Sequence, residues 1–190
     1  YRSRGGGGKL AYFLTFNCTL KRLYLGTNYI RNDVSYFNRV LIVNKTLTEL
    51  DLSDNKICDV GAEVVAHALK CNKTLTYLDM RGNNIGNKGA EAVALALKEN
   101  NTLKKLYINC NYITNEGGEA LLSTLIYNKT LTELYIDENN IDDQLEKKFN
   151  RLVKENRENP EAAKKRVEAA AVEVARARAR ARARVQAEAA

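Results

Sequence analysis

The feature that most constrains this chain is one nine-residue pattern that occurs five times at nearly equal spacing. The pattern is Leu-x-x-Leu-x-apolar-x-x-Asn, and its copies begin at Leu20, Leu47, Leu75, Leu103 and Leu131. Successive copies lie 27 residues apart once and 28 residues apart three times. A fixed period in this range is typical of a solenoid, in which each unit is too small to bury its apolar face alone and must pack on its neighbours.

Within each copy, apolar and polar residues alternate as in a short strand that has one buried face. In the second copy, Leu50 and Leu52 are expected to face the interior, while Glu49 and Asp51 face outward. The asparagine that closes each copy can satisfy backbone groups where the chain leaves the strand, so stacked copies should form a ladder of hydrogen bonds. Its members are Asn28, Asn55, Asn83, Asn111 and Asn139.

Each strand is followed by a segment whose apolar residues are spaced three and four apart, clearest in residues 61–69 and 89–97. This spacing predicts a helix behind each strand. A glycine recurs near the helix start, where a side chain would hold the helix away from its neighbour. These glycines are Gly61, Gly89 and Gly117. Polar residues suited to capping a helix precede them, at Asp59, Asn87 and Asn115. The helix expected in residues 34–43 lacks the glycine and is the least regular.

These residues resemble a known family. The run Asn-Lys-Thr-Leu-Thr-Glu-Leu-Asp-Leu-Ser-Asp-Asn-Lys-Ile, with Gly-Ala-Glu at the start of the next helix, resembles the ribonuclease-inhibitor class of leucine-rich repeats over about residues 9–158. That class occurs in cytosolic nucleotide-binding immune receptors and in the Ran GTPase-activating protein. The resemblance implies an α/β leucine-rich repeat solenoid with a curved parallel sheet inside and helices outside. It also implies that partners bind mainly through the concave face or the strand-end loops.

The chain divides into three parts. Residues 1–8, with four consecutive glycines, are expected to be a flexible linker or a sequence left over from expression. Residues 9–158 form the solenoid, with about five strands, a partial N-terminal repeat and a capping helix near residues 142–156. Residues 159–190 form an alanine- and arginine-rich tail, helical or disordered. Because the chain opens partway through a repeat and begins with Tyr1, we expect a fragment of a longer protein.

The composition is that of a soluble protein of the cytoplasm. Hydrophobic residues make up 45% of the chain and charged residues 28%, and no apolar run is long enough to cross a bilayer. The four cysteines have no metal-ligand spacing and indicate a reducing compartment. They are Cys18, Cys58, Cys71 and Cys110.

One pattern favours secretion instead. An asparagine followed closely by threonine recurs between each helix and the next strand, and Asn-x-Thr is the acceptor sequence for N-glycosylation. We place these asparagines at Asn17, Asn44, Asn72, Asn101 and Asn128. The alternative, which the repeat length and the cysteines favour, is structural: asparagine tolerates the left-handed conformation that ends a helix, and threonine steadies the turn into the strand.

The net charge of +7 belongs to the two ends of the chain. Residues 161–190 hold eight basic and four acidic side chains, and Arg2, Arg4 and Lys9 supply the rest of the excess. A polyanion such as nucleic acid is therefore expected, if anywhere, at the arginines of the tail. These are Arg176, Arg178, Arg180, Arg182 and Arg184. Their alternation with alanine has a period of two and gives no apolar stripe for docking, so a merely solvated helix is the alternative.

No catalytic, cofactor or metal site is indicated by the sequence, and we expect a protein that is not an enzyme. His67 is the only histidine, and its counterparts in the next two repeats are Leu95 and Ser123. The paired acids Asp142 and Asp143 are explained as charges at a helix start.

The outward-facing strand residues are the candidate binding surface, because tyrosine and arginine most often dominate interface energetics. Three columns run across the strands: Arg22, Glu49, Tyr77, Lys105 and Glu133; Tyr24, Asp51, Asp79, Tyr107 and Tyr135; and Gly26, Ser53, Arg81, Asn109 and Asp137. We therefore predict a non-catalytic module that binds a protein partner through its concave face. The alternative explanation of the tyrosines is that they suit exposed strands.

A rival function rests on the resemblance alone. A GTPase-activating protein of the Ran-regulator type would place polar residues of the strand-end loops beside the nucleotide of a GTPase. Asn83, Asn111 and Asp137 are the available residues. Because one scaffold hosts many functions, this reading stands behind the interaction module.

Overall fold

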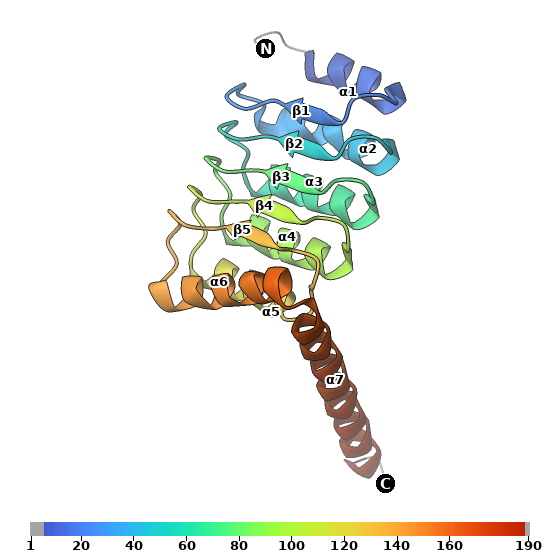
Figure 1. Ribbon diagram of the computed structural model, residues 1–190, viewed down its shortest axis with the longest axis vertical. Coiled ribbons are helices and arrows are strands. Elements are labelled where there is room, and N and C mark those ends of the chain that lie inside the picture. Colours follow the sequence, from blue (N-terminus) through green and yellow to red (C-terminus); the bar gives the residue numbers. More distant parts are fainter. Residues whose placement is uncertain (1–5, 189–190) are drawn as a thin grey trace.

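A computed structural model of the chain describes residues 6–188 (Figure 1). Five parallel strands form one sheet in sequential order, and the leucines at the strand centres pair in register from Leu23 to Leu134. The strands are β1 (Arg22–Tyr24), β2 (Glu49–Asp51), β3 (Tyr77–Asp79), β4 (Lys105–Tyr107) and β5 (Glu133–Tyr135). The α/β leucine-rich repeat solenoid expected from the repeat is therefore confirmed.

Helices lie behind the sheet and at both of its ends (Figure 1). Those behind it are α2 (Tyr36–Val43), α3 (Asp59–Cys71), α4 (Asn87–Glu99) and α5 (Asn115–Leu125). Those at the ends are α1 (Gly6–Phe16), α6 (Asp143–Glu158) and α7 (Pro160–Glu188), which projects away from the solenoid. The first repeat is the least regular, as expected, because a 3₁₀ helix, η1 (Arg31–Ser35), replaces the first turn of its helix.

The repeat leucines form one continuous core between the sheet and the helices. Leu50, Leu78 and Leu106, at the centres of β2 to β4, have no exposed surface. The core cluster extends through every repeat and ends on α6, where Phe149 is fully buried. Each repeat therefore derives its buried surface from its neighbours.

The asparagine ladder predicted at the strand ends is present. Asn83 is buried; its side-chain oxygen accepts hydrogen bonds from the backbone N–H groups of Asn55 at 3.1 Å and Ile57 at 2.9 Å. Its amide nitrogen donates to the carbonyls of Leu52 at 3.0 Å and Met80 at 2.9 Å. One side chain thus satisfies backbone groups of two successive repeats in the dry interior.

A second asparagine ladder runs along the opposite ends of the strands, where the Asn-x-Thr sequences lie. Asn72 is buried; it donates to the carbonyl of Leu41 at 2.6 Å and accepts from the N–H of Leu75 at 2.7 Å. Its backbone is extended, with φ −72° and ψ 130°, so the left-handed turn given as the reason for this row was wrong. The fourth member is Asn100, not Asn101. From Asn44 to Asn128, the amide nitrogens of this row are buried donors to the preceding repeat.

The polar residues expected to cap their own helices instead bind the next repeat. Asp59 is the first residue of α3, and its carboxylate accepts hydrogen bonds from the N–H groups of Gly86 at 2.7 Å and Gly89 at 3.0 Å, at the start of α4. A Cβ added at Gly89 would lie 2.8 Å from the same Asp59 oxygen. As predicted, the close approach of the two helices requires a glycine at this position. The group that caps the start of α4, however, comes from the first residue of the preceding helix, α3.

Helix α6 covers the last repeat with the stripe that the sequence predicted. Asp142 caps it by accepting from the N–H of Leu145 at 2.7 Å, and this hydrogen bond lowers the pKa of the Asp142 carboxyl. Asn156 donates to the carbonyls of Asn128 at 3.0 Å and Leu131 at 2.7 Å. A helical residue thus continues the second asparagine ladder after the repeats have ended.

The start of α7 is docked, which corrects the expectation that the tail has nothing with which to dock. Ala163 is fully buried, and Arg166 donates to Asn156 Oδ1 at 2.7 Å and forms an ion pair with Glu155. Further along, Arg176 and Arg180 are exposed. The side chains of Arg178, Arg182 and Arg184 are not among those that the structure describes.

At the other end of the chain, residues 1–5 of the expected linker lie outside the described residues. Residues 6–8 form the first turn of α1, so the helix begins before the boundary drawn from the sequence.

We expect Asn83→Ala to lower the free energy of unfolding by about 2–3 kcal/mol, because it leaves several buried backbone groups of two repeats without partners. Urea denaturation followed by circular dichroism measures the change. Asn84→Ala is the matched control, since Asn84 is exposed, and its effect should stay within about 0.5 kcal/mol. Equal effects of the two substitutions would contradict the stabilising role of the ladder.

We expect removal of residues 176–190 to leave the thermal transition unchanged, whereas removal of residues 160–190 lowers it. Only the longer deletion removes Ala163 and Arg166, which dock on the solenoid. Arg166→Ala in the full chain should cost about 1–2 kcal/mol through its lost hydrogen bonds. Differential scanning calorimetry measures all three, and identical transitions for both deletions would show that the docking contributes nothing.

Candidate protein-binding surface

The outward-facing strand residues lie on the side of the sheet opposite to α2–α5 (Figure 1). Strand register places neighbouring members of each column directly beside one another: Tyr77 pairs with Lys105, and Tyr107 pairs with Asp79 on one side and Tyr135 on the other. Because each strand is only three residues long, this surface is narrow and runs along the solenoid axis.

Three of the four tyrosines form one cluster across β3 to β5. The ring centroids of Tyr77 and Tyr107 are 5.2 Å apart, and those of Tyr107 and Tyr135 are 4.5 Å apart. The guanidinium of Arg81 lies 5.9 Å from the Tyr107 ring centroid, within reach of a cation–π interaction. Tyr24 is separate from this cluster; its hydroxyl donates to Glu49 at 3.1 Å. The structure therefore concentrates the aromatic surface in the C-terminal half of the face.

A buried carboxylate holds the cluster in place. Asp79 has no exposed surface; it accepts hydrogen bonds from the Tyr77 hydroxyl at 3.2 Å and the Arg81 N–H at 3.0 Å, and Arg81 Nε lies 3.3 Å away. Burial raises the pKa of the Asp79 carboxyl above its ordinary value, against the opposing hydrogen bond and charge of Arg81. Burial also raises the pKa of the Tyr77 hydroxyl, aided by the Asp79 charge. The Asp79 carboxylate thus contacts both the half-buried Tyr77 hydroxyl and the exposed Arg81.

The remaining predicted residues surround this cluster. Lys105 pairs with Glu133 at 2.9 Å, and Asp51 accepts from the N–H of Ser53 at 2.8 Å. Asn109 is half-buried, and its side-chain oxygen is enclosed without a hydrogen-bond partner in the described chain. The face therefore has a central aromatic and basic patch flanked by the Lys105–Glu133 ion pair and by the hydrogen-bonded Asp51. Arg22 lies on β1 and Asp137 just beyond β5, at its two ends.

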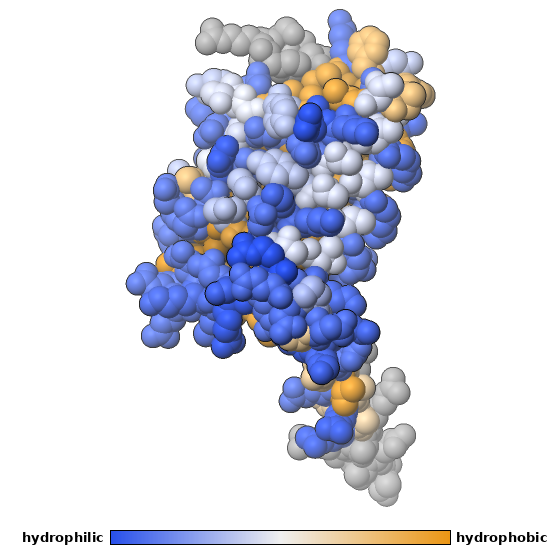
Figure 2. Space-filling view, in the orientation of Figure 1, coloured by the Kyte–Doolittle hydropathy of each residue, from blue (hydrophilic) through white to orange (hydrophobic). Residues whose placement is uncertain are grey.

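The sequence analysis missed two surface features. A groove of about 470 Å³ lies between β5 and α6, a helix whose apolar stripe was expected only to cover the last repeat. At the opposite end, Tyr12, Phe13 and Phe16 of α1 are 66%, 71% and 69% exposed. Figure 2 shows apolar surface at this end of the molecule, whereas the α6 end is hydrophilic. Periodic patterns do not reveal either feature, because both lie where the repeats stop.

Two of the three residues assigned to a GTPase-activating role, Asn83 and Asn111, are buried in the asparagine ladder, while Asp137 is half-buried. Asn83 and Asn111 are 4% and 5% exposed, and their amides bind backbone carbonyls within the ladder. His67 is exposed on α3. Within residues 6–188, no group of three or more His, Cys, Asp or Glu side chains is placed to hold a metal ion. None of the helices described is long and apolar enough to cross a membrane.

Comparison with known families identifies the repeats. The family model described as the TMOD/LMOD leucine-rich domain matches residues 55–162, and a leucine-rich repeat model matches residues 43–66. The searched curated proteins contain no match to the chain. A leucine-rich repeat domain is thus confirmed, while the assignment to the ribonuclease-inhibitor class stays a prediction.

Two solved structures share the fold. The structure titled "Leiomodin-1 Actin-Binding Site 2 (ABS2)" gives a TM-score of 0.72 at 21% identity, covering 90% of this chain and 99% of that one. The tropomodulin C-terminal domain of Caenorhabditis elegans gives a TM-score of 0.71 at 10% identity, covering 84% of this chain and 98% of that one. At such identities these likenesses show the fold alone.

The raised pKa of the Asp79 carboxyl predicts a distinctive pH dependence. Above its ordinary value of 3.8, the unfolded chain loses this proton before the folded chain does, so stability falls as pH rises through the folded-state pKa. Relative to that of Asp79→Asn, the wild-type free energy of unfolding should fall between pH 3.8 and the folded-state pKa of Asp79, and should stay level above that pKa.

Asp142→Asn provides the comparison of opposite sign. The lowered pKa of the Asp142 carboxyl gives stability that is lost as pH falls through that pKa. Urea denaturation at a series of pH values measures both variants. Parallel pH profiles of wild type and Asp79→Asn would contradict the buried position of the carboxylate.

Proposed function

The chain belongs to the TMOD/LMOD leucine-rich domain family, and we propose that it is a non-catalytic module that binds a protein partner through the concave face of its sheet. The observation that carries this proposal is the cluster of Tyr77, Tyr107 and Tyr135, with Arg81 beside it and the buried Asp79 beneath. Large aromatic rings and a guanidinium combine buried area with hydrogen bonding, the combination that dominates binding energy in protein interfaces.

The cluster suits binding because it is already ordered. Binding normally costs free energy to immobilise flexible side chains, about 0.5–1.5 kcal/mol for each. Here the inclined ring contacts, the hydrogen bond from Tyr77 to Asp79 and the Arg81 ion pair hold these side chains before a partner arrives. The rigid parallel sheet fixes their spacing. A partner therefore meets a preformed patch whose centre is aromatic and whose rim is charged.

We propose actin as the partner. The support is the shared family together with the shared fold, since the leiomodin-1 structure is titled as an actin-binding site and nearly its whole length aligns with this chain. An actin-binding role would agree with the cytoplasmic location expected from the cysteines. Nucleic-acid binding by the tail stays a prediction of the sequence.

We expect Tyr107→Ala to weaken actin binding by about 1–3 kcal/mol, because Tyr107 is the central ring of the cluster and contacts both neighbouring tyrosines. Co-sedimentation with actin filaments, or calorimetry with monomeric actin, gives the affinity. Tyr36→Ala is the matched control, since Tyr36 is an exposed tyrosine at the start of α2, away from the sheet face. If the wild-type chain binds neither form of actin, the partner is wrong; if Tyr107→Ala binds with unchanged affinity, the surface is wrong.

A further inference from the structure

The edge of β5 carries backbone groups that every earlier strand uses and that β5 leaves unpaired. The N–H groups of Leu52, Met80 and Ile108 each donate to the next strand at 2.7–2.8 Å. Ile136 is the next member of this series, and within the described chain its N–H has no acceptor. Likewise, the carbonyls of Thr48, Thr76 and Lys104 accept from the next strand, while that of Thr132 has no donor. Such an edge is a template for another strand.

Helix α6 borders this edge without covering it. The groove between them is lined by residues 132–137 on one side and by α6 on the other. The lining residues of α6 are Glu146, Asn150, Val153, Lys154 and Arg157. Leu134 at the centre of β5 stays 8% exposed, whereas the equivalent leucines of β2 to β4 are fully buried. The groove therefore has an apolar floor, a polar wall and a row of free backbone groups.

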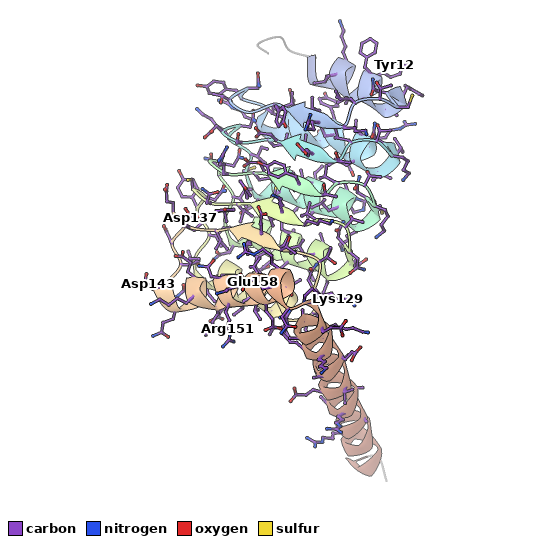
Figure 3. The ribbon with its side chains drawn as sticks, in the orientation of Figure 1. Tyr12, Lys129, Asp137, Asp143, Arg151 and Glu158 are labelled. Carbon is purple, nitrogen blue, oxygen red and sulfur yellow. The ribbon has the colours of Figure 1, made fainter. Side chains whose placement is uncertain are left out.

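Among the groove-lining residues of α6, the basic and the acidic side chains lie at opposite ends; the two basic ones, Lys154 and Arg157, also pair with the exposed Glu158. Lys154 and Arg157, near the end of α6, lie beside the beginning of β5, whereas Glu146 lies nearer Asp137, where β5 has ended. Figure 3 shows the same orientation, with Asp143 at the Asp137 end of α6 and Glu158 at the other. A strand that runs parallel to β5 would place its N-terminal half at the basic end and its C-terminal half at the acidic end.

We propose that this groove binds an extended segment of a protein partner as a sixth parallel strand, acidic at its N-terminal end and basic at its C-terminal end. Main-chain hydrogen bonds to Thr132 and Ile136 would supply the pairing, and the charges of α6 would set direction. The inference rests on the proposed function, because Glu133, Tyr135 and Asp137 belong to both the groove and the concave face. It adds the conformation and charge order of the bound segment.

The probe is a fluorescein-labelled peptide, Asp-Glu-Val-Thr-Val-Thr-Lys-Lys, titrated with the full chain and followed by fluorescence anisotropy. We expect saturable binding that weakens at least about fivefold when the charge order of the peptide is reversed. Methylation of the backbone nitrogens of its central Val and Thr removes strand pairing while keeping the side chains, and should abolish binding. Equal binding of the parent and the methylated peptide, or no binding of the parent, would overturn the proposal.

Charge reversal on α6 supplies the matched protein variants. Lys154→Glu should weaken the acid-first peptide about fivefold and strengthen the reversed peptide. Arg151→Glu makes the same change of charge on α6 outside the groove lining, and should alter neither. If the two variants had identical effects, the net charge of α6 rather than the order of charges along the groove would explain the binding, and the proposal would be overturned.

Two further results separate this inference from its alternatives. If the probe fails while actin binding still depends on Tyr107, the groove is wrong and the proposed function stands. If sedimentation velocity shows that the chain dimerises and that the probe dissociates the dimer, the groove is occupied by a second copy, which also overturns the proposal.

Discussion

The structure depends on the satisfaction of backbone groups inside a core that excludes water. Each repeat turns out of its strand and later turns back into it, and both turns expose N–H and carbonyl groups that no regular element pairs. Two asparagine ladders form hydrogen bonds with these groups; one contains Asn83 and the other contains Asn72. Since an unpaired buried backbone group costs about 1–3 kcal/mol, the stacked leucines are tolerable only because these amides are present.

The end of a solenoid needs a different solution, since the last repeat has no successor. Helix α6 supplies Phe149 to the core and Asn156 to the second ladder, and Arg166 of α7 then binds both Asn156 and Glu155. These contacts close the apolar core and leave the edge of β5 unpaired. The cap therefore protects the leucines without supplying a sixth strand, which is why a groove persists beside β5.

On the concave face, too, one buried side chain accepts hydrogen bonds from two neighbouring residues. Asp79 is buried, and burial raises the pKa of its carboxyl although Arg81 and Tyr77 donate hydrogen bonds to it. The packing of the core offsets the unfavourable free energy of burying this carboxylate. In return, the two side chains that it contacts are fixed in place on the sheet. The buried charge thus connects the packing of β3 to the binding surface that we propose.

The sequence by itself determined the strands, the helices behind them, the first asparagine ladder and the close approach at Gly89, because these recur with the period and follow from local geometry. It also placed the tyrosines on one face. Only the tertiary structure decided which of them meet, that Asp59 caps the following helix, that Asn72 bonds backward in an extended turn, and that Arg166 docks α7. These contacts join residues about one repeat apart or lie beyond the last repeat. They depend on how whole repeats stack and on what replaces the missing one, which no periodic pattern within the chain encodes.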